Sequence, residues 1–158
     1  MKVLLLAVGK PGALLREAIH EYEQRAGRYW SFETIEVKEA RAARNIPEEQ
    51  VRELESQRLL ERVPAGTEMI ALTRIGASWD SERLARHLER RAVAAHPGVS
   101  FLIGGALGLS HTLLQRVAQQ LSLSACTLTH DLARLLLAEQ LYRAGTIARG
   151  EPYHKARA

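Results

Sequence analysis

Short apolar or β-branched runs alternate with helical patterns along the whole chain, and this alternation restricts the fold more than any other feature. Each run is short enough to be a single strand. The runs are VLLLAV (3–8), SFETIEV (31–37), EMIALT (68–73), VSFLIG (99–104) and SACTL (124–128). The helical patterns are LLREAIHEYEQRAG, EEQVRELESQRLLERV, SWDSERLARHLERRAVAA, LSHTLLQRVAQQ and DLARLLLAEQLYRA. This order predicts one α/β domain over residues 1–158, with a mostly parallel sheet flanked by helices.

The last helical pattern is apolar around most of its circumference. We expect Asp131 to cap this helix and Gly145 to end it. Its apolar residues are Leu132, Ala133, Leu135, Leu136, Leu137, Ala138 and Leu141. A helix that buries only one face does not need so many apolar residues. The helix is therefore buried in the monomer core or belongs to a subunit interface, and the pattern supports both.

The segment FLIGGALGLS (101–110) places three glycines between an apolar run and a helix. A Rossmann turn needs G-x-G-x-x-G, whereas the spacing here is G-G-x-x-G, and no GK[ST] follows to make a P-loop. The turn therefore lacks the parts that grip phosphates. Small residues at the carboxyl end of a strand also let a ligand approach the backbone. Spacing alone favours an ordinary tight turn over a ligand loop.

Composition and short motifs limit the function classes. The 22 Lys and Arg residues exceed the 18 Asp and Glu residues, which is compatible with an acidic partner such as RNA. Cys126 is the single cysteine, so no intramolecular disulfide forms, and we interpret it as a small buried hydrophobe. The apolar start is too short for a signal peptide or a membrane span, so we expect a cytoplasmic protein that does not bind a membrane.

Metal and hydrolase motifs are incomplete. HEYEQ (20–24) lacks the second histidine of an HExxH zinc helix, and we expect no metal site. Ser110-His111 and His130-Asp131 contain the residue types of a catalytic triad, but no GxSxG elbow accompanies them. We interpret the serine and the aspartate as helix caps.

Basic residues gather in two places. The first is a helical stripe, interpreted as a solvated face: Arg83, Arg86, His87 and Arg90. The second is the tail RGEPYHKARA, where Arg149 and Lys155 flank Tyr153. Positive charge beside an aromatic ring suits RNA, because it pairs with phosphate while the ring stacks on a base. A generic basic tail and an RNA contact both fit this segment.

Four motifs in order resemble the RlmH family: LIGGxxGLS, LSLSxxTLTH, RxLLxEQLYRA and the terminal GEPYHK. The resemblance extends over nearly all of the chain through MKVLLLAVGK, EYEQR, TIEV and SQRLL. Members are SPOUT-class methyltransferases that use S-adenosylmethionine to methylate N3 of a pseudouridine in 23S ribosomal RNA. The resemblance thus implies this activity on the assembled ribosome, a homodimer, and a C-terminal deep trefoil knot. A non-catalytic RNA- or ribosome-binding module on the same scaffold is the alternative.

The resemblance also implies site residues. Contacts to S-adenosylmethionine carry over to Leu72, Gly104, Leu123, Ser124, Ala125, Cys126, Thr127 and Leu128. His154 would accept the N3 proton, and Arg143 would stabilise negative charge or hold a phosphate. The RNA contacts would be Arg149, Tyr153 and Lys155, and the short tail would reach the active site of the partner subunit.

Three positions depart from the family pattern. Thr73 stands where the family has an acidic residue, and Leu107 stands where it has a polar or acidic one. Thr129 replaces a proline. A carboxylate that would lie beside the cofactor is therefore missing from this chain.

Overall fold

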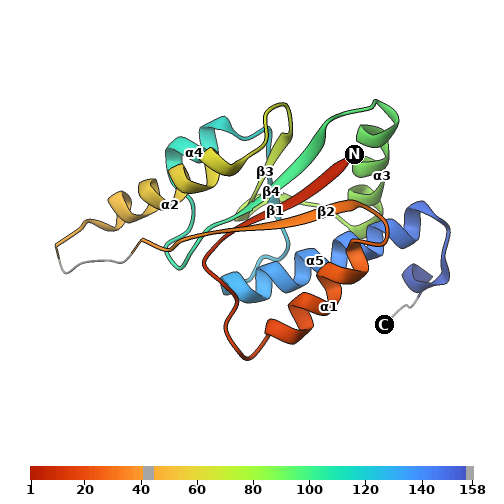
Figure 1. The fold of residues 1–158 in the computed structure, drawn as a ribbon, viewed down its shortest axis with the longest axis horizontal. Helices are drawn as coiled ribbons and strands as arrows, with labels where there is room; N and C mark the ends of the chain where they lie inside the picture. The colour runs from red at the N-terminus through yellow and green to blue at the C-terminus, as the bar shows by residue number, and fades with distance from the viewer. Residues whose placement is uncertain (41–44, 156–158) are drawn as a thin grey trace.

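Five parallel strands form one sheet in the order β2-β1-β4-β3-β5 in the computed structural model, which describes residues 1–40 and 45–155 (Figure 1). The strands are β1 (Lys2–Val8), β2 (Ser31–Val37), β3 (Glu68–Ser78), β4 (Gly98–Ile103) and β5 (Gln119–Ser122). The helices are α1 (Arg16–Ala26), α2 (Glu48–Arg62), α3 (Ser81–Val93), α4 (His111–Arg116) and α5 (His130–Ala148), followed by the 3-10 helix η1 (Pro152–Lys155). The predicted α/β class with a parallel sheet flanked by helices is confirmed.

Helices cover both faces of the sheet (Figure 1). Successive side chains of a strand point to opposite faces, and in β1 both sets are apolar. Val3 and Leu5 pack in the core that includes residues of α1, α3 and α5. Leu4 and Leu6 pack in the core that includes residues of α2 and α4. Burial on both faces explains why β1 is a continuous apolar run instead of an alternating one.

The fifth strand lies earlier in the chain than we predicted. SACTL (124–128) is a loop, and α4 ends at Arg116, so that β5 includes Gln119 and Gln120. These polar residues fit an edge strand because both find partners on β3. The Gln119 amide donates to Glu68 Oε1 at 3.1 Å, and the Gln120 Oε1 accepts from Thr73 Oγ1 at 3.1 Å.

The predicted ends of α5 are also wrong. Thr129 caps the helix, since its hydroxyl accepts a hydrogen bond from the Leu132 amide at 3.3 Å. The carboxylate of Asp131 accepts instead from the Gly12 amide, at 2.8 Å. The helix continues through Gly145 to Ala148, and Gly145 packs against the ring of Tyr29.

The interpretation of α5 as a core helix is confirmed for part of its length, and the interface interpretation stays a prediction. Leu137, Ala138 and Leu141 are buried in the core of the monomer. Leu132 and Leu136 are exposed. The helix is thus a core helix that keeps a strip of apolar surface.

The expected cap at Ser110 is confirmed, and the basic stripe is solvated at Arg83, Arg86 and Arg90 but not at His87. The side chains of Ser110 and Asp80 cap α4 and α3. His87, however, is buried, and its ring stacks beside Trp79 with centroids 4.9 Å apart. Its Nε2 lies 2.9 Å from Glu68 Oε2, which gives the imidazole a polar partner inside the core.

Candidate functional site

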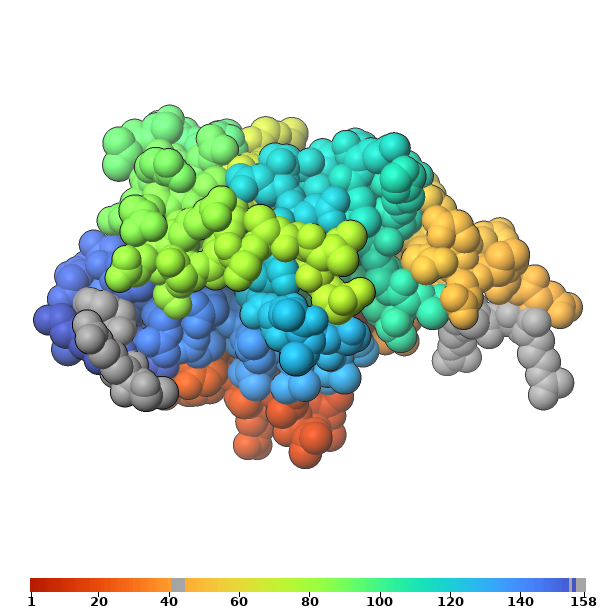
Figure 2. All heavy atoms as spheres, turned by 180° about the vertical axis from the view of Figure 1, so that it is seen from behind, coloured from red at the N-terminus to blue at the C-terminus, as the bar shows by residue number. Residues whose placement is uncertain are grey.

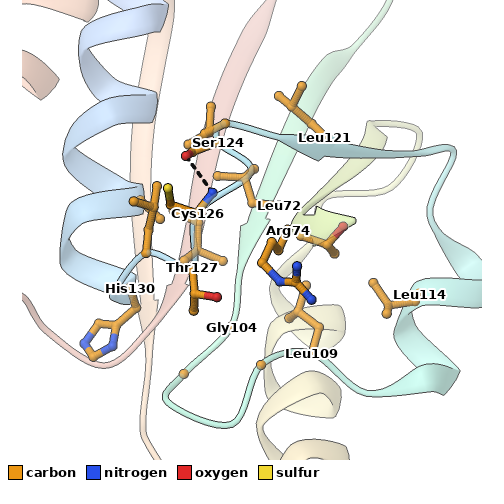
Figure 3. A pocket seen from close by; sticks show the side chains of 17 residues that line it. Leu72, Arg74, Gly104, Leu109, Leu114, Leu121, Ser124, Cys126, Thr127 and His130 are labelled. Carbon is orange, nitrogen blue, oxygen red and sulfur yellow. Dashed lines mark hydrogen bonds between the residues drawn. The ribbon is translucent and has the colours of Figure 1, made fainter. Parts of the chain in front are cut away.

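A cavity of about 320 Å³ lies at the carboxyl ends of β3, β4 and β5 (Figure 3). Its position follows from the topology of the sheet. The chain leaves β3 for α3 on one face, and it leaves the neighbouring β4 for α4 on the other face. Where adjacent connections diverge in this way, an open α/β sheet has a crevice that commonly binds ligands. We call this cavity the pocket.

Most of the predicted cofactor residues line the pocket. They are Leu72, Gly104, Leu123, Ser124, Cys126, Thr127 and Leu128. Ala125 is exposed and is not part of the lining. The topology therefore brings residues from β3, from the end of β4 and from the segment after β5 to one place, as Figure 2 shows on one face of the molecule.

Residues 123–128, which we call the pocket loop, are held by local hydrogen bonds. The Ser124 hydroxyl accepts from the Cys126 amide at 3.0 Å (Figure 3). The Ser122 hydroxyl donates to the Ser124 carbonyl at 2.9 Å. Because this segment is a loop and not a strand, Cys126 is exposed, and its interpretation as a buried hydrophobe is wrong.

The glycine turn, residues 104–108, folds tightly against itself at the floor of the pocket. The Gly108 amide donates to the Gly105 carbonyl at 3.0 Å, and Gly108 has φ +80°. A Cβ on Gly104 would lie 2.7 Å from the carbonyl carbon of Gly108, too close for any side chain. Gly104 thus has to be glycine for the turn to close, and the same turn lines the pocket.

The predicted catalytic and RNA-binding residues gather at the far end of α5. Arg143 forms an ion pair with Glu139 at 2.6 Å, and its guanidinium lies 4.8 Å from the Tyr153 ring centroid. The Tyr153 hydroxyl donates to Glu139 at 3.1 Å. Arg149 lies over the ring of Tyr29 at 4.6 Å.

Ionisation in this cluster is shifted toward the protonated forms. The hydrogen bond to Glu139 raises the pKa of Arg143, which stays charged. Burial, together with the charge of Glu139, raises the pKa of the Tyr153 hydroxyl, which remains a hydrogen-bond donor. Lys155 is exposed on η1. His154 belongs to η1, but its side chain lies outside the described part of the structure.

Comparison with known proteins places this arrangement in a family. A family model described as "Predicted SPOUT methyltransferase" matches residues 1–154. The chain belongs to the SPOUT methyltransferase family. The resemblance noted in the sequence is thereby confirmed, and the chain is an enzyme that transfers a methyl group.

Curated relatives of this SPOUT methyltransferase match it over their whole length. Ribosomal RNA large subunit methyltransferase H of Gemmatimonas aurantiaca is 47% identical over 156 residues, covering 98% of this chain and 100% of that protein. The protein of the same name from Syntrophotalea carbinolica is 45% identical, covering 98% of this chain and 99% of that protein. A solved structure of a probable methyltransferase from Bordetella pertussis superposes with a TM-score of 0.54 at 18% identity, covering 90% of this chain and 95% of that one, which shows the fold alone.

Several pocket residues of this methyltransferase were missed in the sequence. Arg74 lies two residues after Leu72, in a segment where the pairing of β3 with β5 shifts register; Thr73, between them, was noted in the sequence only as a departure from the family pattern. His130 lines the pocket from the start of α5. Arg74 could have been predicted in the pocket because it is close in sequence to Leu72, a predicted cofactor residue. His130 could not, because its place in the pocket depends on the turn between the pocket loop and α5.

The pocket and the Arg143 cluster lie apart within one protomer. His130 begins α5, and Arg143 lies near its other end. With a rise of 1.5 Å per residue, the backbone positions are separated by about 20 Å. Arg143 of one chain therefore lies far from its own pocket.

The described residues contain neither a cluster of metal-ligating side chains nor a membrane-spanning helix. No group of three or more His, Cys, Asp or Glu side chains there is placed to hold a metal ion. None of the helices in residues 1–40 and 45–155 has the length and hydropathy of a membrane span.

Proposed function

We propose that this enzyme transfers a methyl group from S-adenosylmethionine to N3 of a pseudouridine in 23S ribosomal RNA. The observation that carries the proposal is the match to large-subunit ribosomal RNA methyltransferases over the full length of those relatives. The placement of the implied cofactor residues around one pocket supports it. The assembled ribosome as substrate, a homodimer and a trefoil knot remain predictions from the RlmH resemblance. A cytoplasmic location remains a prediction from the sequence.

The pocket lining fits S-adenosylmethionine. Apolar side chains, among them Leu72, Leu121 and Leu128, offer surface for an adenine ring. The hydroxyls of Thr127 and Ser124 and the backbone of the glycine turn offer hydrogen-bond partners. S-adenosylmethionine carries no phosphate, so a pocket without a phosphate-binding fingerprint suffices.

The protein has to position N3 and to accept its proton. When bound, S-adenosylmethionine supplies an activated sulfonium methyl group. The pocket then contributes by orienting the reactants, which removes much of the entropic barrier. We assign acceptance of the N3 proton to His154 and stabilisation of the developing negative charge to Arg143. Glu139 holds that guanidinium in place.

A homodimer accounts for the distance between the two groups of residues. If the tail of one subunit reaches the pocket of the other, Arg143 and His154 complete a site that each chain alone leaves open. The exposed apolar residues Leu132 and Leu136 lie close to the pocket end of α5 and provide surface for a second copy. The dimer thus belongs to the proposal and does not follow from the monomer alone.

Methyl transfer is tested with labelled S-adenosylmethionine and ribosomes from cells that lack the modification. We expect label on a pseudouridine N3 with the wild type. Gly104→Val should abolish cofactor binding in calorimetry, because its side chain would displace the backbone of Gly108. Ala92→Val on the exposed face of α3 is the matched control and should bind normally.

Two outcomes would contradict the proposal. Normal binding by Gly104→Val would show that the pocket is misplaced. Salt-dependent ribosome binding without any transferred label would favour the non-catalytic module instead.

A further inference from the structure

Arg74 is a cation at the pocket, and none of the ion pairs among residues 1–40 and 45–155 includes it. The basic side chains that line the pocket are Arg74 and His130. No carboxylate of the described residues lines it. The described ion pairs of arginine involve other residues: Arg25, Arg52, Arg86, Arg91, Arg134 and Arg143. Arg74 is exposed to solvent and also lines the pocket, whose other lining residues are mostly apolar.

The fold holds the backbone around Arg74 in a defined place. The pairing of β3 with β5 shifts register between Leu72 and Ala77, so residues 73–76 form a bulge. On one side, Thr73 Oγ1 donates to Gln120 Oε1 at 3.1 Å. On the other side, Gly76 packs so closely on β5 that a Cβ would lie 2.6 Å from the Gln120 carbonyl. Both ends of the bulge are thus attached to β5.

The direction of the side chain follows from this bulge. Figure 3 shows Arg74 above the glycine turn, between Thr127 and Leu114 in that view. Its neighbour Ile75 is exposed to solvent. Thr73, which stands where the family has an acid, bonds to Gln120 and offers Arg74 no negative charge.

An arginine in this setting favours a planar anion. The guanidinium presents parallel N–H donors that match both oxygens of a carboxylate. Ligand binding also displaces water from the pocket, which strengthens the attraction between the two charges. The adenosyl and sulfonium parts of S-adenosylmethionine are neutral or positive, so the carboxylate is the group that fits.

We propose that Arg74 binds the carboxylate of the methionine moiety of S-adenosylmethionine, an inference that rests on the proposed function. The enzyme would then recognise the amino-acid end of its donor through a residue of the β3 bulge. Binding should discriminate between nucleosides that have this carboxylate and those that lack it.

The test compares two nucleosides that share the adenosine and the thioether. S-adenosylhomocysteine has the carboxylate, and 5′-methylthioadenosine lacks the amino-acid end. In calorimetry, Arg74→Gln should weaken S-adenosylhomocysteine binding about tenfold or more. The affinity for 5′-methylthioadenosine should change by less than about twofold. Arg74→Lys should restore part of the loss, because it keeps the charge without the planar fork.

Arg90→Gln is the matched control, since Arg90 is exposed on α3, away from the pocket. An equal loss for both nucleosides would overturn the proposal, because it would indicate a distorted pocket. Unchanged nucleoside binding with a raised KM for ribosomes would overturn it in favour of an RNA phosphate as the partner of Arg74. If the wild type binds neither nucleoside, the proposed function itself is wrong and the subsite is rejected with it.

Discussion

Gly145 lies inside α5, and the ring of Tyr29 packs directly on its α-carbon. A Cβ at this position would lie 2.8 Å from Tyr29 Cδ1 and closer still to Cγ. The ring has little freedom to move aside. Its hydroxyl is hydrogen-bonded to Glu151, and Arg149 covers its face. The glycine therefore allows α1, the turn after it and α5 to meet closely.

Gly145→Ala should destabilise the protein, although alanine is the better helix former by about 1 kcal/mol. Overpacking against Tyr29 should outweigh that gain and lower the free energy of unfolding by about 2 kcal/mol. Urea denaturation measures the change. In a Tyr29→Leu background the same substitution should be neutral or stabilising, because the obstructing ring is gone. A stabilised Gly145→Ala single variant would refute this packing argument.

Single residues show where prediction from the sequence stops. In the sequence, a glycine that ends a helix cannot be told from one that makes room for a neighbouring ring. Gly145 was therefore interpreted wrongly as the end of α5. Cys126 looked buried because it follows apolar neighbours, yet its segment is a loop. Gly104 was assigned to the pocket through the family resemblance. Glycine is also required at this position because the backbone of Gly108 lies so close to it. The spacing of the glycines did predict that tight turn.

At the scale of elements, Glu68 joins α3, β3 and β5. Its carboxylate accepts from Arg91 Nε at 2.8 Å and from the Gln119 amide at 3.1 Å, and it lies 2.9 Å from His87 Nε2. Burial alone would raise the pKa of this carboxyl group. The hydrogen bonds from Arg91 and His87 outweigh burial and hold its pKa below the ordinary 4.5. Because β5 ends just before the pocket loop, this cluster also anchors one side of the site.

A lowered pKa in the folded state means that ionised Glu68 stabilises the protein above about pH 4.5. This stability is lost as the pH falls through the folded-state pKa. Glu68→Gln should therefore lower the free energy of unfolding at pH 7 by about 2 to 3 kcal/mol. Its difference from the wild type should shrink as the pH is lowered below 4.5, as measured by urea denaturation at several pH values.

Glu82→Gln is the control for this titration. Glu82 pairs with Arg86 at 3.4 Å on the exposed face of α3, so its removal should change stability by less than about 0.5 kcal/mol. A Glu68→Gln deficit that stays constant with pH would show that packing, and not the charge, accounts for the effect.

Helices and the first four strands could be predicted because each carries its own periodic or apolar signal. β5 could not, since its first two residues are glutamines whose partners Glu68 and Thr73 belong to a strand distant in sequence. The bulge of β3 was hidden for the same reason. Register is a property of two strands, and EMIALT alone contains no sign of it. The site was located by resemblance, while its shape came from these non-local pairings.

At the scale of the whole molecule, α5 connects the pocket to the Arg143 cluster. Its first turn lines the pocket, and its last turns hold Arg143 and lead to η1. Arg134, buried in the second turn of α5, pairs with Glu23 at 2.7 Å and Glu36 at 2.9 Å, which fixes the helix against α1 and β2. A rigid helix of this kind keeps its two ends apart within one protomer. The proposed mechanism then requires each active site to use both subunits.

Mixed dimers distinguish a shared site from a site within one chain. His154→Ala should lower kcat more than it lowers the affinity for S-adenosylmethionine, and Gly104→Val should prevent binding. If His154 acts across the dimer, a mixed dimer of these two variants has one site with both defects and one site with neither. Random mixing should then restore about one quarter of the wild-type methyl transfer, although Gly104→Val alone is inactive and His154→Ala alone is slow.

The opposite geometry gives a different result with the same proteins. If His154 acts on the pocket of its own chain, every site in the mixed dimer retains one defect, and mixing restores nothing. Light scattering during size-exclusion chromatography supplies the necessary control, because a monomer at micromolar concentration would exclude sharing before any activity is measured. Recovered activity therefore requires both the dimer and the crossing of the tail, and it depends on no assumption about where the side chain of His154 rests.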